Sequence, residues 1–474
     1  MIDNDNSRTI LINPYPGGTG LNEATVLPPL GLGYIAAVIE QHGGKVQIID
    51  ANLEGLETNA VLERISPGVR LIGIYVNSFN YNAVSDLARG IHIKYPDVVV
   101  VLGGPLPSAS PRDVLDNIIC NGVVRGEGEF SLLKIRENLA RGSQAFDREV
   151  PGAVFYDEKK QLIMNPVERI RNLDILPFPA YHLFPPLKNY KVRSRQTPTA
   201  AIITSRGCSQ QCIFCSKDVF LDKVTFRSAE NVLEEIDFLV EHYGVRQVDI
   251  LDDNFMQKIS RVQEILDGLI ERDYGISVNL QSGVRTEKLD DAILNKMKKA
   301  GFYKIGFGIE SADEKVLKIA RKNLNLEKAR QAVHSAKTHG FEVYGFFIIG
   351  LPGETEAAFQ RTLNFAREVD FDIANFCMAI PFPGTELYNM VKDKGKFLVD
   401  TTKNINEGFY AGNVFYEYEG IKAEDILRRY KRAYKEFYTL KRRIRILLKI
   451  RSIHEIVWLW DSFKFVMKGL FKKK

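Results

Sequence analysis

The sequence has 474 residues, of which 45% are hydrophobic and 26% are charged. A chain of this composition can fill more than one core and is not mainly disordered. Its length suggests roughly two to four domains. Five cysteines are too few for a secreted fold held by disulfides, and residues 1–20 lack the pattern of a signal peptide. We therefore expect a protein of the reducing cytoplasm.

Charge is unevenly distributed along the chain. Residues 421–474 carry 17 Lys and Arg against 5 Asp and Glu, so this segment has a net charge of +12 and residues 1–420 about −7. An enzyme that acts on nucleic acids usually has basic residues around its active site. We therefore expect no nucleic-acid partner, and the basic tail needs a local explanation.

Short β-rich runs alternate with helical stretches between residues 9 and 126, which indicates an α/β fold with a doubly wound, Rossmann-like parallel sheet. Helices are expected near 32–41 and 82–94. Ligands bind such sheets at the carboxyl ends of the strands. The corresponding segments of this sequence are Asn13-Pro14, Asp50, Asn77-Ser78, Gly103-Gly104-Pro105 and Arg125 to Glu129.

The sequence pattern changes after residue 143, and this change separates the first α/β region from a second region. Residues 154–165 are predicted to form a β-hairpin, and the proline-rich stretch that follows indicates an extended linker. A second series of six strands with intervening helices then follows. Six strands are too few for a closed eightfold barrel, so we predict an open partial barrel. The expected parts are an α/β domain at 1–143, a hairpin and linker at 144–195, a barrel at 196–400 and a helical C-terminal extension at 401–474.

Three of the five cysteines, Cys208, Cys212 and Cys215, lie close together after an expected strand. Closely spaced cysteines on an irregular loop are typical of iron–sulfur ligation, and three of them leave one iron of a four-iron cluster open. That iron can bind the amine and carboxylate of a small molecule such as S-adenosylmethionine (SAM). A zinc site and unligated thiols are the alternatives. Structural zinc needs four ligands, and the nearest histidines are His182 and His242.

The cysteine loop resembles that of the radical SAM superfamily, in which three residues separate the first two cysteines, two separate the next pair, and an aromatic precedes the last. Phe214 fills the aromatic position. Residues 308–311, 345–354 and 381–386 are similar to the family's motifs at the ends of the fourth, fifth and sixth barrel strands. The resemblance implies a [4Fe–4S] cluster on the three cysteines and an enzyme that cleaves SAM.

The same resemblance implies contacts to SAM. Phe214 would lie beside the adenine, Arg285 would pair with the methionine carboxylate, and Glu310 would accept hydrogen bonds from the ribose or the amine. An Asp-Asp pair ends the second barrel strand, where many members have a Gly-Gly-Glu segment. The candidate SAM contacts are Phe214, Asp252, Asp253, Arg285, Glu310, Ser311, Gly350 and Pro352. No catalytic residue is assigned.

The N-terminal domain resembles the cobalamin-binding domain of one class of radical SAM enzyme, through residues 28–34, 103–105 and 124–129. Only Cys120 precedes the cysteine loop, which excludes the second cluster of methylthiotransferases. The usual fingerprint that places a histidine on the cobalt is absent. The candidate cobalamin contacts are Asn13, Leu30, Gly31, Ser78, Gly103, Gly104 and Glu127. A degenerate domain without cobalamin is the alternative.

The basic tail places apolar and basic residues at helical spacing over 423–471. Its apolar run at 456–460 is much shorter than the ~20 residues that a membrane-spanning helix needs. We expect an amphipathic helix that lies on an anionic bilayer, peripherally at the inner membrane surface. A helix packed on the barrel and a weak nucleic-acid tail are the alternatives.

Taken together, these resemblances imply an enzyme that generates a 5′-deoxyadenosyl radical and uses cobalamin to methylate an unactivated carbon. The substrate would be a small, hydrophobic, lipid-like or natural-product-like molecule, and a flavodoxin or ferredoxin would supply electrons. One alternative is a cyclising or oxidising enzyme of the same architecture, similar to anaerobic magnesium-protoporphyrin monomethyl ester cyclase. A methylthio-transferring RNA modifier and a non-catalytic cobalamin or iron–sulfur sensor are the others.

Overall fold

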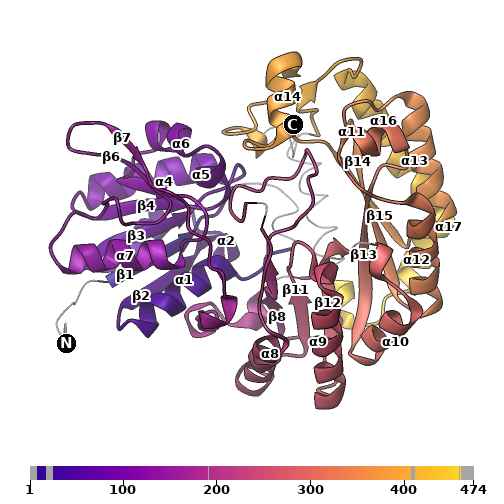
Figure 1. Ribbon diagram of the computed structural model, residues 1–474, viewed down its shortest axis with the longest axis horizontal. Coiled ribbons are helices and arrows are strands. Elements are labelled where there is room, and N and C mark those ends of the chain that lie inside the picture. Colours follow the sequence, from indigo (N-terminus) through magenta and orange to yellow (C-terminus); the bar gives the residue numbers. More distant parts are fainter. Residues whose placement is uncertain are drawn as a thin grey trace.

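The computed structural model describes residues 8–17, 25–190, 192–221, 223–284, 286–406, 412–457 and 460. Figure 1 shows two α/β units side by side, the N-terminal unit on the left and the barrel on the right. Two helices of the C-terminal extension, α16 and α17, lie on the outer side of the barrel (Figure 1).

The N-terminal unit is built on a sheet whose described strands have the order β2-β1-β3-β4-β5-β6-β7. The first five strands are parallel, which confirms the predicted doubly wound sheet. They are β1 (Arg8–Asn13), β2 (Lys45–Asp50), β3 (Val69–Tyr75), β4 (Val99–Gly103) and β5 (Gly122–Val124).

Successive side chains of a strand point to opposite faces of the sheet. Because both faces of this sheet carry apolar side chains, helices cover both. Leu11 joins the core beneath α1 and α7, whereas Ile10 and Ile12 join the core beneath α3, α4 and α6. The helices of this unit are α1 (Leu30–Gln41), α2 (Ala51–Glu54), α3 (Thr58–Glu63), α4 (Tyr81–Lys94), α5 (Pro105–Ala109), α6 (Pro111–Asn117) and α7 (Glu129–Ala140).

The predicted hairpin forms and extends the N-terminal sheet. Strand β6 (Ala153–Tyr156) pairs antiparallel with β5 and with β7 (Leu162–Met164). The connector that follows contains three 3₁₀ turns, at Leu173–Ile175, Tyr181–Leu183 and Leu187–Asn189. It contacts both units, because the Tyr190 hydroxyl donates to Asp50 Oδ2 at the end of β2 and the Tyr181 hydroxyl donates to Glu235 Oε1.

The second unit is an open barrel of six parallel strands, as predicted, in the order β15-β14-β13-β12-β11-β8. Its described edge strands, β8 and β15, do not pair with each other, so the barrel stays open. The strands are β8 (Thr199–Ile202), β11 (Gln247–Ile250), β12 (Ser277–Val284), β13 (Phe302–Glu310), β14 (Glu342–Ile349) and β15 (Ile373–Met378). Two short antiparallel pairs flank it, β9 (Ser205–Arg206) with β10 (Thr225–Phe226) and β16 (Lys396–Phe397) with β17 (Tyr416–Glu417).

Polar side chains start most helices of the barrel by accepting a hydrogen bond from a first-turn amide. The capping residues are Ser228, Asp290, Asp313, Asn325, Thr355 and Thr385. The barrel helices are α8 (Ala229–Tyr243), α9 (Ile259–Arg272), α10 (Asp291–Lys299), α11 (Glu314–Ile319), α12 (Leu326–Thr338), α13 (Glu356–Glu368) and α14 (Glu386–Lys394).

The C-terminal extension contributes α16 (Ala423–Phe437) and α17 (Leu440–Leu448). Helix α16 packs on β14 and β15, and its apolar face, which includes Ile426 and Phe437, is buried there. The hydroxyls of Tyr434 and Tyr438 donate to the carbonyls of Phe376 and Ala374 on the edge strand β15. The structure thus places α16 on the barrel, which was the alternative to the predicted membrane-bound helix for this segment.

Candidate functional site

The cysteine loop begins where β9 ends. Gly207 has a φ of +88°, and a Cβ there would lie 2.3 Å from the carbonyl oxygen of Lys223. Only glycine fits this turn without displacing the backbone. The chain then passes through Cys208, Cys212 and Cys215, and all three line a cavity of about 550 Å³ at the carboxyl ends of the barrel strands. The tight turn therefore directs the predicted cluster ligands into the barrel mouth.

The three thiols lie within electrostatic reach of one another. Burial raises the pKa of Cys215 to about 11, and charge on Cys212 and Cys208 contributes to the shift. Among the described residues, no group of three or more His, Cys, Asp or Glu side chains converges closely enough to hold a single metal ion. The cysteine ligands of a four-iron cluster bind different irons and need not converge on one point. The arrangement of the loop is therefore compatible with such a cluster.

Glu310 occupies a strained position at the end of β13. Its φ is +63°, unusual for a residue with a side chain, and the pairing of β13 with β14 shifts register between Gly308 and Glu310. The carboxylate lines the cavity and accepts a hydrogen bond of 3.0 Å from Lys322 Nζ. Strain of this kind persists where surrounding structure enforces it, often at functional sites.

The two adjacent aspartates after β11 have different surroundings. Asp252 is buried behind the cavity, where its Oδ1 accepts from the Thr204 amide at 2.6 Å and its Oδ2 from the Thr204 hydroxyl at 2.6 Å. Asp253 lines the cavity, and its Oδ2 accepts from the Gly207 amide at 3.0 Å. Burial raises the pKa of Asp253. Of the pair, only Asp253 faces the space where SAM is expected.

Phe214 also lines the cavity, whereas other predicted SAM contacts lie outside its lining. Ser311 is buried, within 3.2 Å of the Thr362 hydroxyl, and its own hydroxyl accepts from the Asp313 amide. Gly350 and Pro352 are buried in the loop that follows β14. Arg285 falls outside the described residues.

The loop after β14 is held from behind by the C-terminal extension. The Tyr416 hydroxyl donates to the carbonyl of Gly350. Arg429 on α16 donates to both the carbonyl and Oε1 of Glu354, each at 3.2 Å. Burial raises the pKa of Glu354 to about 7, against the opposing effects of Arg429 and the Gly350 amide. Side chains far along the sequence thus shape the predicted SAM-binding loop.

A second cavity, of about 490 Å³, lies at the carboxyl ends of the N-terminal strands. A Cβ added at Gly31 would meet no atom within 4 Å, and one at Gly103 would meet only the carbonyl oxygen of Val124, at 3.9 Å. These glycines leave open space that a flat macrocycle can occupy. The predicted cobalamin contacts that line this cavity are Asn13, Leu30, Gly31, Gly103, Gly104 and Glu127, and Ser78 lies outside the lining.

The polar groups of this second cavity are mostly bonded within the protein. Asn13 Nδ2 donates to Asp50 Oδ1 at 2.8 Å. Both carboxylate oxygens of Glu127 have partners, since Oε1 accepts from Arg206 at 2.7 Å and Oε2 accepts from the Ile170 amide at 2.9 Å. Arg169 Nη1 adds an ion pair of 2.6 Å to Oε2. The cavity is thus shaped by residues whose charges are already neutralised.

Arg206 connects the barrel to the N-terminal unit, and the sequence did not reveal it. Its guanidinium donates to Glu127 Oε1 and Glu129 Oε1, both at 2.7 Å, and lies 4.9 Å from the ring centre of Tyr34. Arg206 is 5% exposed and precedes Cys208 by two residues. The sequence offered one signal, the alternation of Glu127 and Glu129 with glycines. Their partner, Arg206, lies 79 residues after Glu127 and 77 residues after Glu129.

Three residues, Pro105, Val219 and Phe220, line both cavities. Phe220 is held on one side by the Arg169 guanidinium, 5.1 Å from its ring centre. The cavities therefore adjoin, with a mainly apolar wall between the cysteine loop and the carboxyl ends of the N-terminal sheet. A molecule at this wall would be within reach of groups bound on either side.

Comparison with known families agrees with this geometry. The family model of the radical SAM superfamily matches residues 202–366, and that of the B12 binding domain matches residues 20–135. The chain belongs to the radical SAM superfamily and is an enzyme of its cobalamin-binding class. Its cofactors are a [4Fe–4S] cluster, SAM and cobalamin, in agreement with the sequence-based expectation.

An uncharacterised methyltransferase of Pyrococcus horikoshii is 32% identical to the chain, over 77% of this chain and 78% of that protein. The anaerobic magnesium-protoporphyrin IX monomethyl ester cyclase of Rubrivivax gelatinosus is 27% identical, over 82% of this chain and 70% of that one. Among solved structures, the cobalamin-dependent SAM radical enzyme OxsB matches with a TM-score of 0.72 at 18% identity, over 96% of this chain and 72% of that one. The last similarity establishes the fold.

Proposed function

We propose that the enzyme methylates an unactivated carbon of a hydrophobic or natural-product-like small molecule. The observation that carries this proposal is the wall of Pro105, Val219 and Phe220 shared by the two cavities. When bound, the cluster and SAM supply a 5′-deoxyadenosyl radical, and cobalamin supplies a methyl group. A substrate carbon at the shared wall would be open to both, and the apolar side chains there would exclude water.

The cavity of the barrel would hold the radical-generating groups. Cys208, Cys212 and Cys215 would ligate the cluster, and Phe214 would lie against the adenine. Asp253 and Glu310, which face the cavity, would accept hydrogen bonds from the amine or ribose of SAM. The remaining predicted contacts are Arg285, for the methionine carboxylate, and Asp252, Ser311, Gly350 and Pro352, which would support these groups from behind the cavity.

The cavity of the N-terminal unit would hold cobalamin. Leu30, Gly31, Gly103 and Gly104 supply an apolar and open floor for the corrin ring. Asn13 and Glu127 also line this floor, but their side chains are bonded to protein groups, so they would fix its shape. Ser78 remains a candidate contact beyond the described lining.

The partners follow from the chemistry. Reduction of the cluster requires an electron donor, which we propose is a flavodoxin or ferredoxin of the cytoplasm. None of the five cysteines is paired in a disulfide, which suits a reducing compartment. The part of the chain that the structure describes contains no helix long and apolar enough to cross a membrane. We also propose peripheral contact with the inner membrane surface through the C-terminal extension.

Cyclisation or oxidation without methyl transfer is a second candidate, favoured by the similarity to the magnesium-protoporphyrin cyclase. The same radical step would then lead to a product that gains no methyl group. Product mass separates the two reactions.

The test uses anaerobically reconstituted enzyme, loaded with cobalamin and given SAM that carries a deuterated methyl group. Candidate hydrophobic substrates from the organism's small-molecule extract would be screened by mass spectrometry. Methylation predicts a product heavier by the labelled methyl group, together with 5′-deoxyadenosine and S-adenosylhomocysteine. A product formed with 5′-deoxyadenosine but no labelled methyl group would overturn methylation in favour of cyclisation or oxidation.

A further inference from the structure

Helix α17 presents its apolar side chains to solvent. None of its residues is buried, and Leu440, Leu447 and Leu448 are 75%, 60% and 74% exposed. Ile444 on the same helix is 49% exposed. Helix α16 has the opposite arrangement, because its Ile426 and Phe437 are buried on the barrel. The apolar face of α16 is thus directed toward the barrel, whereas the apolar face of α17 is directed toward solvent.

The polar side of α17 faces the barrel and is fixed there by ion pairs. Arg442 Nη2 and Arg445 Nη2 each lie 2.7 Å from Asp370 Oδ1. Just after the helix, Lys449 Nζ lies 2.5 Å from Asp372 Oδ1. These contacts oppose rotation of the helix about its axis, which would otherwise bury the leucines. The outward apolar face is therefore built into the fold.

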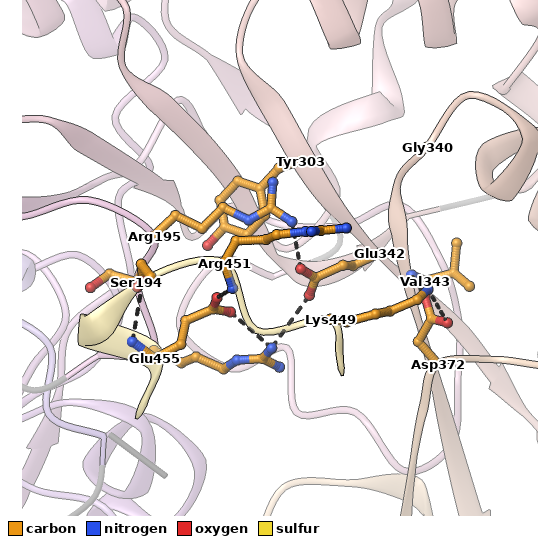
Figure 2. Close-up of polar contacts among 12 residues, drawn as sticks. Ser194, Arg195, Tyr303, Gly340, Glu342, Val343, Asp372, Lys449, Arg451 and Glu455 are labelled. Carbon is orange, nitrogen blue, oxygen red and sulfur yellow. Dashed lines mark hydrogen bonds and ion pairs between the residues drawn. The ribbon is translucent and has the colours of Figure 1, made fainter. Parts of the chain in front are cut away.

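The segment after α17 is anchored in the same way, as Figure 2 shows. Glu455 is buried and accepts 2.9 Å hydrogen bonds from Arg193 Nη2 and from the Arg451 amide. Ser452 donates to the carbonyl of Ser194 at 3.2 Å. The apolar side chains between and after these anchors point outward, and Ile453, Ile456 and Val457 are 70%, 53% and 52% exposed.

The exposed charges of this segment have one sign, since Glu455 is buried. From Leu440 to His454 the sequence contains six Lys and Arg and no Asp or Glu. Three of these cations face the barrel, and the other three, Lys441, Arg443 and Arg451, are exposed. An exposed apolar face flanked by cations is the pattern of a helix that lies in the interface of an anionic bilayer.

We propose that the outer face of the tail docks on an anionic phospholipid surface. This face consists of Leu440, Ile444, Leu447, Leu448, Ile453, Ile456 and Val457, with Lys441, Arg443 and Arg451 at its sides. The apolar side chains enter the headgroup region, and the three cations contact lipid phosphates. The proposal does not depend on the proposed methylation.

The position of this face defines how the enzyme would sit on the bilayer. Asp370 and Asp372 precede β15, and Glu342, an ion-pair partner of Arg193, starts β14. The face is therefore anchored near the amino ends of the barrel strands, whereas the cysteine loop lies at their carboxyl ends. Docking would hold the enzyme at the membrane and leave the mouth of the barrel open to the cytoplasm.

The test measures cosedimentation of the full-length holoenzyme with vesicles of phosphatidylcholine alone or mixed with phosphatidylglycerol. We expect binding to the mixed vesicles only. The double change Leu447→Ser and Leu448→Ser should lower the bound fraction by at least about tenfold, because it removes apolar surface that would be buried in lipid. Lys441→Gln and Arg443→Gln together should weaken binding by about tenfold or more.

Ile93→Ser provides a matched control, because Ile93 on α4 is also 75% exposed but lies in the N-terminal unit. It should bind vesicles like the wild type. All variants should keep the cluster absorbance, which shows that they are folded.

Three outcomes would overturn the proposal. The first is a wild-type enzyme that does not bind the mixed vesicles, and the second is a leucine double variant that binds as well as wild type. The third is a wild-type dimer that the leucine double variant loses, without vesicle binding, because the face would then be covered by a second copy of the chain.

Discussion

The two cavities occupy equivalent places in their sheets but are built from different side chains. The N-terminal cavity is lined mostly by apolar residues and glycines, and its carboxylates, Glu127 and Glu129, are bonded to Arg206. The barrel cavity gathers three thiols, two carboxylates and two lysines around its space. We therefore propose that the first cavity would hold its cofactor by shape, whereas the second would hold cofactors by ligation and charge.

The largest expected effect concerns ligation in the barrel cavity. Cys212→Ala should remove one of three cluster ligands, lower the iron content of reconstituted enzyme from about four per chain to near zero, and abolish formation of 5′-deoxyadenosine. Iron analysis and chromatography of the SAM products measure both effects. Cys120→Ala is the control, since Cys120 lies outside both cavity linings and should retain iron. Full iron and turnover in the Cys212 variant would contradict the ligand assignment.

The next effect concerns the contact between the two units. Arg206→Met should leave Glu127 and Glu129 buried without this cation and lower the free energy of unfolding by about 3–5 kcal/mol. Urea denaturation measures this change. The exposed ion pair of Arg64 with Glu54 provides the comparison, because Arg64→Met should cost less than about 1 kcal/mol. An equal loss in the free energy of unfolding for the two variants would contradict the role of Arg206 in joining the two units.

A smaller effect should distinguish shape from charge in the N-terminal cavity. Gly31 lies in the first turn of α1, and a side chain there would project into open space. Gly31→Leu should therefore leave stability unchanged or higher, since leucine favours helix more than glycine does. The leucine side chain should weaken cobalamin binding by at least about tenfold, because it fills part of the N-terminal cavity. Corrin absorbance after gel filtration measures this binding. Unchanged binding would place the corrin elsewhere.

The smallest effect concerns the loop behind the barrel cavity. Burial raises the pKa of Glu354 from 4.5 to about 7, so the folded state binds this proton more tightly than the unfolded chain. The stabilisation is present below the unfolded pKa and is lost as pH rises through about 7. As pH rises from the unfolded pKa of Glu354 to its folded pKa, the free energy of unfolding should fall by on the order of 1–3 kcal/mol. Glu354→Gln should flatten this part of the pH profile, and an unaltered profile would exclude Glu354 as its source.

The sequence predicted features that depend on local pattern. Strand and helix periodicity predicted both sheets, and the short spacing of Cys208, Cys212 and Cys215 predicted a loop whose thiols line one cavity. Glycines at strand ends, such as Gly103, predicted the floor of the N-terminal cavity. These signals lie within a few residues and need no knowledge of how distant segments meet.

Features that depend on long-range packing were not predictable. Neighbouring side chains at the end of an extended strand point in opposite directions, so the sequence could not tell whether Asp252 or Asp253 faces the cavity. It also could not pair Arg206 with carboxylates of another unit. Helical spacing showed that the tail is amphipathic, but it could not show that the apolar face of α16 is buried while that of α17 is exposed.

The contact between Arg193 and Glu455 has a consequence for synthesis of the protein. The two residues are separated by 262 positions, so the ribosome completes every strand of the barrel before it adds the second carboxylate partner of Arg193, the first being Glu342 on β14. Until translation has passed Glu455, the amino end of the nascent barrel therefore lacks this carboxylate, and Arg193 has Glu342 as its ion-pair partner there.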